Sequence, residues 1–333
     1  MFLPAGALAS AGTGTFFFMI VAGLLLSLVI AFGAAVGFIP ALRLEAPKRS
    51  RVFVALCIPI FLAPLVVPQE ATFVRFVASV CSLLLWMKVY DLHLDAARTS
   101  RLDWRPLLAF LLNWGSMVLR TLEAEPRPTR CDNWVGLAVS LAAVGASVPI
   151  VGWVFRLDWS VQPFAVEHGA KVVALFCALV PAGAASSAIW RLGDGKTRDW
   201  FNAPFLSRTP ADFWRRYNRP VQQFFREDIF RQVGGFRSPA RATLVTFAIS
   251  GLVHEYVFGV ATGRVQGYQM IFFLINGCAV AATLQVRPRG CQAVPWIAGT
   301  VAFNLVSSVF FFASLNAVMP FYSRGVPEWL TLW

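Results

Sequence analysis

Eight long apolar stretches constrain this chain more than any other feature of its sequence. They span residues 15–39, 52–68, 71–90, 134–155, 169–190, 242–262, 268–286 and 293–320. A helix that crosses a bilayer needs about 20 predominantly apolar residues. The composition agrees, because 57% of the residues are hydrophobic, only 14% are charged and the mean hydropathy is +0.63. The sequence therefore predicts an all-α polytopic membrane protein with about eight transmembrane helices in one bundle, and it excludes a water-soluble enzyme.

The basic residues predict how these helices are oriented. Of the 29 Lys and Arg residues, 24 lie in the segments 40–51, 88–133, 191–241 and 287–292, and 5 lie on the opposite side. Short loops rich in Lys and Arg stay in the cytoplasm. We therefore expect an integral multi-pass protein with its large basic loops in the cytoplasm and both termini on the opposite side. A nucleic-acid partner is not expected, since such binding needs basic runs on a soluble fold.

Nothing in the sequence divides the chain into separate domains. It has no internal repeat, low-complexity tract or long linker, so residues 1–333 are expected to form a single transmembrane domain. The first apolar stretch has no basic residue before it and is interpreted as a true span, not a cleaved leader. A further apolar run, Pro106 to Leu119, is too short to span comfortably and is expected to be re-entrant or interfacial. The six scattered cysteines show no metal-ligand spacing, and no metal site is predicted.

The stretch 242–262 carries an ionisable pair where the other stretches are almost bare. His254 lies 13 residues after Arg241, which is about 20 Å along a helix, so His254 and Glu255 are expected deep in the bilayer. Such groups usually mark function. Ser250 lies one turn before His254 on the same face, and with Gly251 it would let a helix or a substrate chain approach the imidazole. Glu255 should reach a neighbouring helix. The alternative is that His254 only bonds helices together.

The loop 191–241 contains a second unusual segment, in which aromatic and basic residues alternate. Thr209 or Asp212 would cap a helix that has Pro210 in its first turn. This composition is typical of an amphipathic helix at the membrane surface, with rings in the acyl boundary and guanidinium groups among phosphates. It predicts a landing site for a lipid-like substrate with an anionic head; the alternative is a loop helix with no substrate role. The alternating residues are Phe213, Trp214, Arg215, Arg216, Tyr217, Arg219, Phe224, Phe225 and Arg226.

Together these two segments resemble the membrane-bound O-acyltransferase (MBOAT) superfamily. The loop segment reads Asp212-Phe-Trp-Arg-Arg-Tyr-Asn218, and the span segment reads Ser250-Gly-Leu-Val-His254-Glu255-Tyr256. The wax synthase branch is the most similar, because it shares the Phe-Trp…Asn loop and the Ser-Gly-x-x-His-Glu helix. The His-Glu-Tyr run is also similar to that of the diacylglycerol and sterol acyltransferases. The motifs cover only about residues 210–256, and elsewhere the likeness is topological.

The resemblance implies transfer of a fatty acyl group from acyl-CoA to the hydroxyl of a long-chain alcohol or diacylglycerol. His254 takes the position of the catalytic histidine and Asn218 that of its partner. A neutral imidazole in lipid suits a general base that must deprotonate a hydroxyl. No cofactor is expected beyond acyl-CoA as co-substrate, and membrane lipids surround the chain. The residues expected to contact substrate are Trp214, Arg215, Arg216, Tyr217, Arg219, Ser250 and Glu255.

Three other functions remain open from the sequence. Asp91 and Asp95, with Asp194 and Asp199, could hold Mg²⁺ against a diphosphate, as in an intramembrane prenyltransferase. A lipid transporter without catalysis is the alternative that is not an enzyme, although the chain lacks repeated halves. The third function is also an acyl transfer, in which a short-chain donor modifies a cell-envelope sugar. The acceptor, the acyl length and the oligomeric state are left open.

Overall fold

The computed structural model describes residues 5–124 and 128–331, and over these residues it contains helices and turns but no strand. Seven helices in this described part are long and apolar enough to cross a membrane. The eighth predicted span corresponds to the helix Tyr268–Thr283, which has 16 residues and extends about 24 Å at 1.5 Å per residue. The all-helical, multi-pass membrane fold is therefore confirmed. The seven helices are Gly14–Arg43, Ala46–Val66, Thr72–Leu94, Arg130–Arg156, Phe164–Leu192, Pro239–Thr262 and Gly290–Val318.

The chain folds as two compact units. Unit 1 comprises Met1–Leu111, Glu255–Gln266 and Ala317–Met319, and unit 2 comprises Leu112–His254, Gly267–Asn316 and Pro320–Trp333. The helix α10 (Pro239–Thr262) contributes to both, because the boundary falls between His254 and Glu255. The single domain over residues 1–333 stays a prediction.

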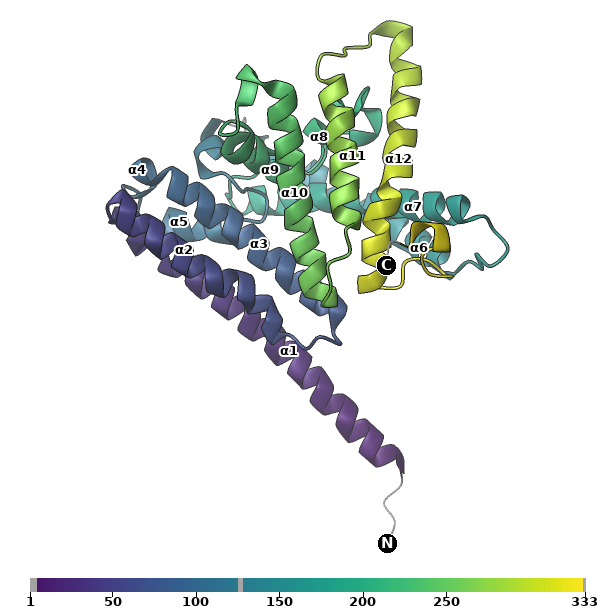
Figure 1. Ribbon diagram of the computed structural model, residues 1–333, viewed down its shortest axis with the longest axis horizontal. Helices are drawn as coiled ribbons and strands as arrows, with labels where there is room; N and C mark the ends of the chain where they lie inside the picture. The colour runs from purple at the N-terminus through teal and green to yellow at the C-terminus, as the bar shows by residue number, and fades with distance from the viewer. Residues whose placement is uncertain (1–4, 125–127, 332–333) are drawn as a thin grey trace. The chain divides into compact units, whose positions relative to one another are not determined.

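Unit 1 is built around three long helices, α1, α2 and α3, that lie side by side (Figure 1). A Cβ atom added at Gly23 of α1 would lie 3.0 Å from the backbone oxygen of Val66, so a small residue lets the turn after α2 approach α1. The elements are α1 (Ala5–Gly37), η1 (Pro40–Arg43), α2 (Ala46–Leu62), η2 (Ala63–Val66), α3 (Thr72–Leu94), α4 (Ala96–Thr99) and α5 (Trp104–Leu112).

The short helix α5 is held by a lysine from α3. The Lys88 Nζ donates to the carbonyl oxygens of Phe110 (2.7 Å) and Leu111 (3.1 Å), at the end of α5. The last carbonyls of a helix lack partners within the helix and favour a cation. The place of Lys88 in the basic segment 88–133 predicts a loop residue. In the structure Lys88 is buried instead, with 2% of its surface exposed. With nine residues, α5 is too short to span, as expected for this part of the chain.

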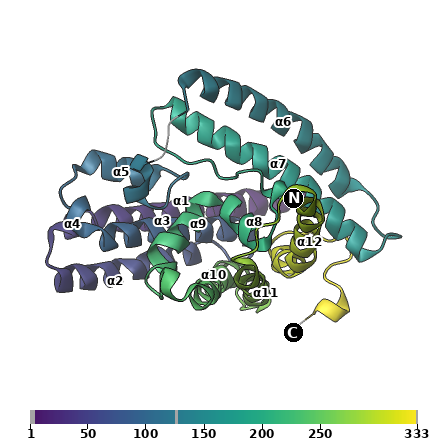
Figure 2. The ribbon, with the colours of Figure 1, turned by 90° about the horizontal axis from the view of Figure 1, so that it is seen from above.

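Unit 2 contains the motif segments. Its helices α6 and α7 lie side by side (Figure 2), and α6 begins with a capping box between Thr129 and Asp132. The elements are η3 (Leu119–Ala124), α6 (Arg130–Arg156), α7 (Phe164–Leu192), η4 (Pro204–Leu206), α8 (Pro210–Arg216), α9 (Arg219–Phe224), a π-helix η5 (Phe225–Phe230), η6 (Gly235–Arg237), most of α10, α11 (Tyr268–Thr283), η7 (Gly290–Gln292), α12 (Ala293–Val318) and η8 (Glu328–Leu330).

Buried polar residues of α7 bind the segment after α12. His168 Nδ1 lies 2.8 Å from the Tyr322 hydroxyl, and Lys171 Nζ donates to the carbonyl oxygen of Phe321 at 2.6 Å. Lys171 also pairs with Glu167 one turn earlier, at 2.6 Å. These contacts satisfy charges that would otherwise be costly inside an apolar unit.

Candidate active site

His254 lies in α10 with one ring nitrogen engaged by its own helix. Its Nδ1 lies 2.8 Å from the backbone oxygen of Ser250, and a carbonyl oxygen can only accept a hydrogen bond. Nδ1 therefore carries the proton, and in the neutral ring Nε2 has the lone pair. The rings of Phe273 (α11) and Phe311 (α12) lie 4.3 and 6.4 Å from the imidazole, between centroids. A proton acceptor thus lies among apolar rings.

Small residues bring α10 and α11 into close contact beside this histidine. A Cβ atom added at Gly251 would lie 3.0 Å from Met270 Sδ and 3.3 Å from Met270 Cα. Towards the start of α10, a Cβ atom at Gly277 of α11 would lie 2.7 Å from the Cβ of Phe247. The two helices therefore run antiparallel in van der Waals contact, and the close approach predicted from Ser250 and Gly251 is made by α11.

Glu255 is buried and bonds to the turn that follows its own helix. Its Oε2 accepts a hydrogen bond from the backbone N–H of Gln266 at 3.3 Å. This contact is with the turn after α10, whereas the sequence predicts a contact with a neighbouring helix. The reason is its position near the end of α10, where the chain turns back within reach of the carboxylate.

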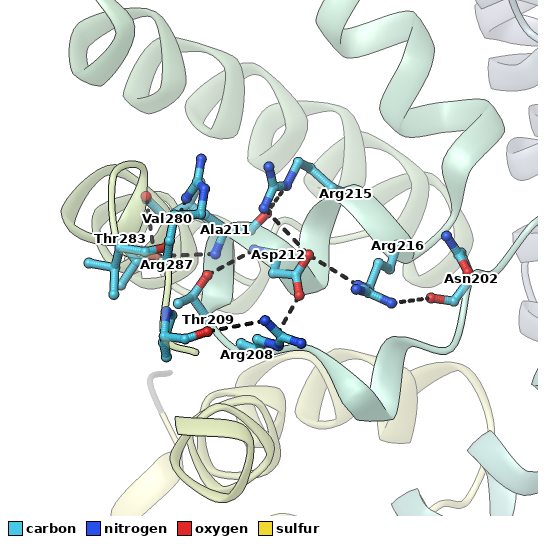
Figure 3. Close-up of polar contacts among 12 residues, drawn as sticks. Asn202, Arg208, Thr209, Ala211, Asp212, Arg215, Arg216, Val280, Thr283 and Arg287 are labelled. Atoms are coloured by element: carbon cyan, nitrogen blue, oxygen red, sulfur yellow. Dashed lines mark hydrogen bonds and ion pairs between the residues drawn. The ribbon is translucent and has the colours of Figure 1, made fainter. Parts of the chain in front are cut away.

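The loop helix α8 begins as the sequence predicts. Thr209 is the N-cap and accepts from the backbone N–H of Asp212 (3.1 Å), while Pro210 occupies the first turn. Asp212 accepts from the backbone N–H of Arg208 (3.1 Å) and pairs with Arg216 at 3.0 Å (Figure 3). Burial alone would raise the pKa of Asp212, but these partners outweigh it and lower the pKa below its ordinary value. Asp212 is therefore an anionic centre that orders the arginines around it.

The aromatic residues of the loop pack on the protein itself, which corrects the prediction that they lie in the acyl boundary. Trp214 Nε1 donates to Asn276 Oδ1 of α11 at 3.1 Å, and its ring lies 5.8 Å from that of Phe273. Tyr217 stacks on Phe213 at 5.2 Å, and burial raises the pKa of its phenol to about 12. Large rings bury much apolar area, and α10 and α11 offer them a surface that the sequence pattern does not reveal.

Asn218 separates two short helices where the sequence predicts one. Its backbone is left-handed, with φ 41° and ψ 55°, a conformation that Asn tolerates better than most residues. It follows Tyr217, whose ring lies 5.8 Å from that of Trp214. Since Trp214 packs on Phe273 and Phe273 on His254, the loop motif and the span motif share one aromatic cluster.

The loop arginines fall into two groups, although the sequence treats them as one. Arg215 and Arg216 line a pocket of about 260 Å³ with three further arginines, and Arg219 belongs elsewhere. Burial lowers the pKa of Arg198 to about 10, and repulsion from Arg219 and Arg226 adds to this. The first group is Arg208, Arg215, Arg216, Arg287 and Arg289, and the second is Arg198, Arg219 and Arg226.

Two of the four aspartates considered for Mg²⁺ pair with arginines. Asp95 lies 3.7 Å from Arg98, and Asp199 pairs with Arg191 at 2.8 Å. Over residues 5–124 and 128–331, no three His, Cys, Asp or Glu side chains gather in a way that could hold a metal ion.

Several residues of this region carry no motif and were missed in the sequence. They are Phe273, Asn276, Phe311, Arg198, Arg208, Arg287 and Arg289. Of these residues, only Asn276 could have been found from the sequence, because a buried amide within an apolar stretch needs a partner. The others depend on which helices meet.

Comparison with known proteins shows similarity to one family of acyltransferases. The family model described as the membrane-bound O-acyltransferase family matches residues 171–314, which include both motifs. The chain is 25% identical over 296 residues to an Arabidopsis thaliana protein described as acyl-CoA–sterol O-acyltransferase 1, covering 83% of this chain and 84% of the relative.

Two further relatives have related descriptions. An Arabidopsis thaliana protein described as probable long-chain-alcohol O-fatty-acyltransferase 1 is 25% identical over 284 residues, 75% of this chain and 78% of its own. The probable sterol O-acyltransferase 1 of Schizosaccharomyces pombe is 35% identical over 81 residues, 24% of this chain and 15% of its own. The family match spans both motifs, and together with these relatives it supports membership of the membrane-bound O-acyltransferase superfamily.

Proposed function

We propose that this protein transfers a fatty acyl group from acyl-CoA to the hydroxyl of a lipophilic acceptor, with His254 as general base. The observation that carries the proposal is the hydrogen bond from His254 Nδ1 to the oxygen of Ser250. That bond supports a tautomer with the lone pair on Nε2. It also restrains the ring, so the base does not have to be oriented when substrate arrives.

The proposed reaction requires two proton transfers and one exchange of bonds at the thioester. His254 Nε2 takes the proton of the acceptor hydroxyl while the oxygen attacks the thioester carbonyl carbon. The C–S bond then breaks, the ester forms, and the imidazolium returns the proton to the CoA thiolate. Phe273 and Phe311, beside the ring, would exclude water that competes with the acceptor.

Asn218 is proposed as the partner that orients the thioester or donates to the developing oxyanion. An amide N–H can stabilise such an oxygen. Its support is the aromatic cluster that joins Tyr217 and Trp214 of the loop to Phe273. The left-handed backbone fixes Asn218 at the junction of α8 and α9, which would hold its side chain in one place.

We assign the phosphates of CoA to the group formed by Arg198, Arg219 and Arg226. Burial is the main cause of the lowered pKa of Arg198, and repulsion from Arg219 and Arg226 lowers it further, while Glu227 opposes the shift. A bound phosphate would relieve that repulsion, and arginine suits phosphate geometry.

The acceptor is proposed to be a long-chain alcohol, giving a wax ester, with diacylglycerol and sterol as the other classes to be tested. The descriptions of the relatives name sterols and long-chain alcohols. All three acceptors carry one reactive hydroxyl on a lipophilic body and could reach His254 from the bilayer.

The test is ester formation from labelled palmitoyl-CoA with a long-chain alcohol, a diacylglycerol and a sterol. Replacing His254 with Ala or Gln should lower the rate by about 10²–10⁴-fold, the usual contribution of a general base. The matched control is His93→Gln, since His93 stacks on Phe53 in unit 1; it should keep its activity. Full activity in a folded His254→Ala protein would refute the mechanism.

The same preparation separates the other functions. Activity that a chelator abolishes and that consumes a prenyl diphosphate would indicate a prenyltransferase. Movement of lipid between liposomes with no covalent product would indicate a transporter. Either result, without ester formation from any thioester, would overturn the proposed function.

A further inference from the structure

A second binding region lies around Asp212 and is separate from the residues that surround His254. Five guanidinium groups and one carboxylate line the pocket of about 260 Å³. The short segment before α12 closes it, because Arg208 donates to the backbone oxygen of Pro288 at 3.1 Å (Figure 3). An excess of guanidinium groups in one pocket favours a phosphate ester of net negative charge.

An apolar groove of about 440 Å³ is lined by residues that adjoin those of the pocket in the chain. Thr209 lines the pocket and the next residue, Pro210, lines the groove, while the backbone N–H of Ala211 donates to Thr283, which also lines the groove. Its other walls come from the first turns of α12, where Pro295, Trp296, Gly299 and Phe303 lie.

The groove is in a position that bilayer lipids reach. Helix α12 belongs to a membrane-crossing segment that begins at Gly290, directly after Arg289, so the arginines lie at one end of a span. Trp296 is 41% exposed and Val294 is 68% exposed. A tryptophan near the end of a span is typical of the headgroup level, and apolar side chains exposed on such a helix face acyl chains.

We propose that the arginine pocket and the groove together bind one anionic phospholipid, with its phosphate among the arginines and an acyl chain along α12. Basic pockets between the ends of transmembrane helices recognise such headgroups. In a phospholipid only the glycerol backbone separates phosphate from chain, which suits a pocket and a groove lined by adjacent residues, Thr209 and Pro210. In acyl-CoA the pantetheine arm lies between them.

The position of the groove relative to His254 also distinguishes a phospholipid from acyl-CoA as its occupant. The rings beside the imidazole are Phe273 and Phe311, and neither lines the groove. A chain lying in the groove therefore has no contact with the residues around the proposed base. The lipid would instead brace α8, whose Trp214 packs on Phe273, and so support the motif segment from outside.

The proposal is tested with the full chain in phosphatidylcholine nanodiscs that contain increasing amounts of phosphatidylglycerol with brominated acyl chains. Bromine quenches nearby tryptophan, and the difference between the native protein and Trp296→Phe isolates the signal of Trp296. Trp296 should be quenched at a lower mole fraction of brominated phosphatidylglycerol than of brominated phosphatidylcholine. Equal quenching by the two lipids would overturn the proposal.

Two variants test the two halves of the site. Arg287→Gln with Arg289→Gln should weaken the apparent affinity for phosphatidylglycerol about 25-fold, which corresponds to about 2 kcal/mol for the two basic residues together. Gly299→Leu should prevent quenching by filling the groove, since no atom lies within 4 Å of an added Cβ there. Arg101→Gln with Arg105→Gln, which changes the same charge outside the pocket, should leave quenching unchanged.

Competition with palmitoyl-CoA identifies the ligand. If palmitoyl-CoA at catalytic concentrations displaces the brominated lipid, and Arg287→Gln with Arg289→Gln raises the KM for palmitoyl-CoA, the pocket belongs to the acyl donor and the phospholipid proposal is wrong. If the variants keep the native KM while losing phosphatidylglycerol selectivity, it is supported. The quenching and displacement measurements do not need catalysis, so the proposed function can fail separately.

Discussion

At the scale of single residues, three ionisable groups inside the helices are satisfied by nearby partners. Lys171 pairs with Glu167 at 2.6 Å, Lys88 holds the end of α5, and Glu255 accepts from Gln266. A charge without such a partner would be very costly in an apolar interior. His254 is therefore not the only polar group in a span. What distinguishes it is a hydrogen bond that leaves the lone pair on Nε2 and the aromatic cluster around the ring.

Asp212 should stabilise the loop in a manner that depends on pH. Its folded pKa lies below the ordinary value of 3.8, so its contribution is present above that value and is lost as the pH falls through the folded pKa. We expect Asp212→Asn to lower the Tm by the same amount from about pH 7 to about pH 5, and by less towards about pH 3. Thermal unfolding across this range measures the difference.

The control for this prediction is Asp103→Asn, which removes an exposed carboxylate away from the pocket. It should change the Tm little at any pH. A Tm difference for Asp212→Asn that is as large at about pH 3 as at about pH 7 would show that the side chain acts by shape or by neutral hydrogen bonds, and not by charge.

At the scale of elements, the short helices α8 and α11 matter more than their length suggests. Helix α11 is shorter than a full span, yet its residues contact both motifs: Phe273 meets His254, and Asn276 bonds to Trp214. The break at Asn218 ends α8 within reach of α11 and lets α9 start in a new direction. The site is therefore assembled by packing on α11, and close contact between α10 and α11 should be essential.

Gly277→Ala should destabilise the protein by forcing these two helices apart. The added Cβ would lie 2.7 Å from that of Phe247, and overpacking of this kind costs about 1–3 kcal/mol. We expect a lower Tm and reduced transferase activity. Gly145→Ala in α6 is the matched control, because nothing lies within 4 Å of an added Cβ there, and Ala is the better helix former. Equal effects of the two substitutions would contradict this interpretation.

At the scale of the whole molecule, seven long apolar helices and the shorter α11 fit a multi-pass membrane protein of the O-acyltransferase superfamily. The proposed chemistry has a requirement at this scale: CoA is water-soluble, so its site must face the compartment that supplies it. The basic segments 191–241 and 287–292 contain both arginine groups. Their sidedness therefore decides whether the donor can arrive.

Cysteine labelling can measure that sidedness. In a protein whose only cysteine is the exposed Cys291, a membrane-impermeant maleimide should label sealed inside-out vesicles and not right-side-out cells. A cysteine placed at the exposed Ser160 should show the opposite pattern, because the segment between α6 and α7 is predicted on the other side. Labelling of both positions from one side would contradict the predicted topology.

Local patterns explain what could be predicted from the sequence. Each span depends on the hydropathy of its own residues, and the start of α8 depends on Thr209, Pro210 and Asp212, which are neighbours in the chain. The helices and the start of α8 were predicted well because their physics acts over a few residues. The motifs that point to His254 and Asn218 are also local, and the catalytic roles of these two residues stay a prediction.

Only the tertiary structure decided which side chains meet across the chain. It turned Trp214 and Tyr217 inward, separated Arg219 from Arg215 and Arg216, and added Arg287 and Arg289 from a distant segment. These outcomes depend on contacts between α8, α11 and the start of α12. A composition of rings and arginines allows either a lipid-facing or a protein-facing arrangement, and the available packing surface selects between them.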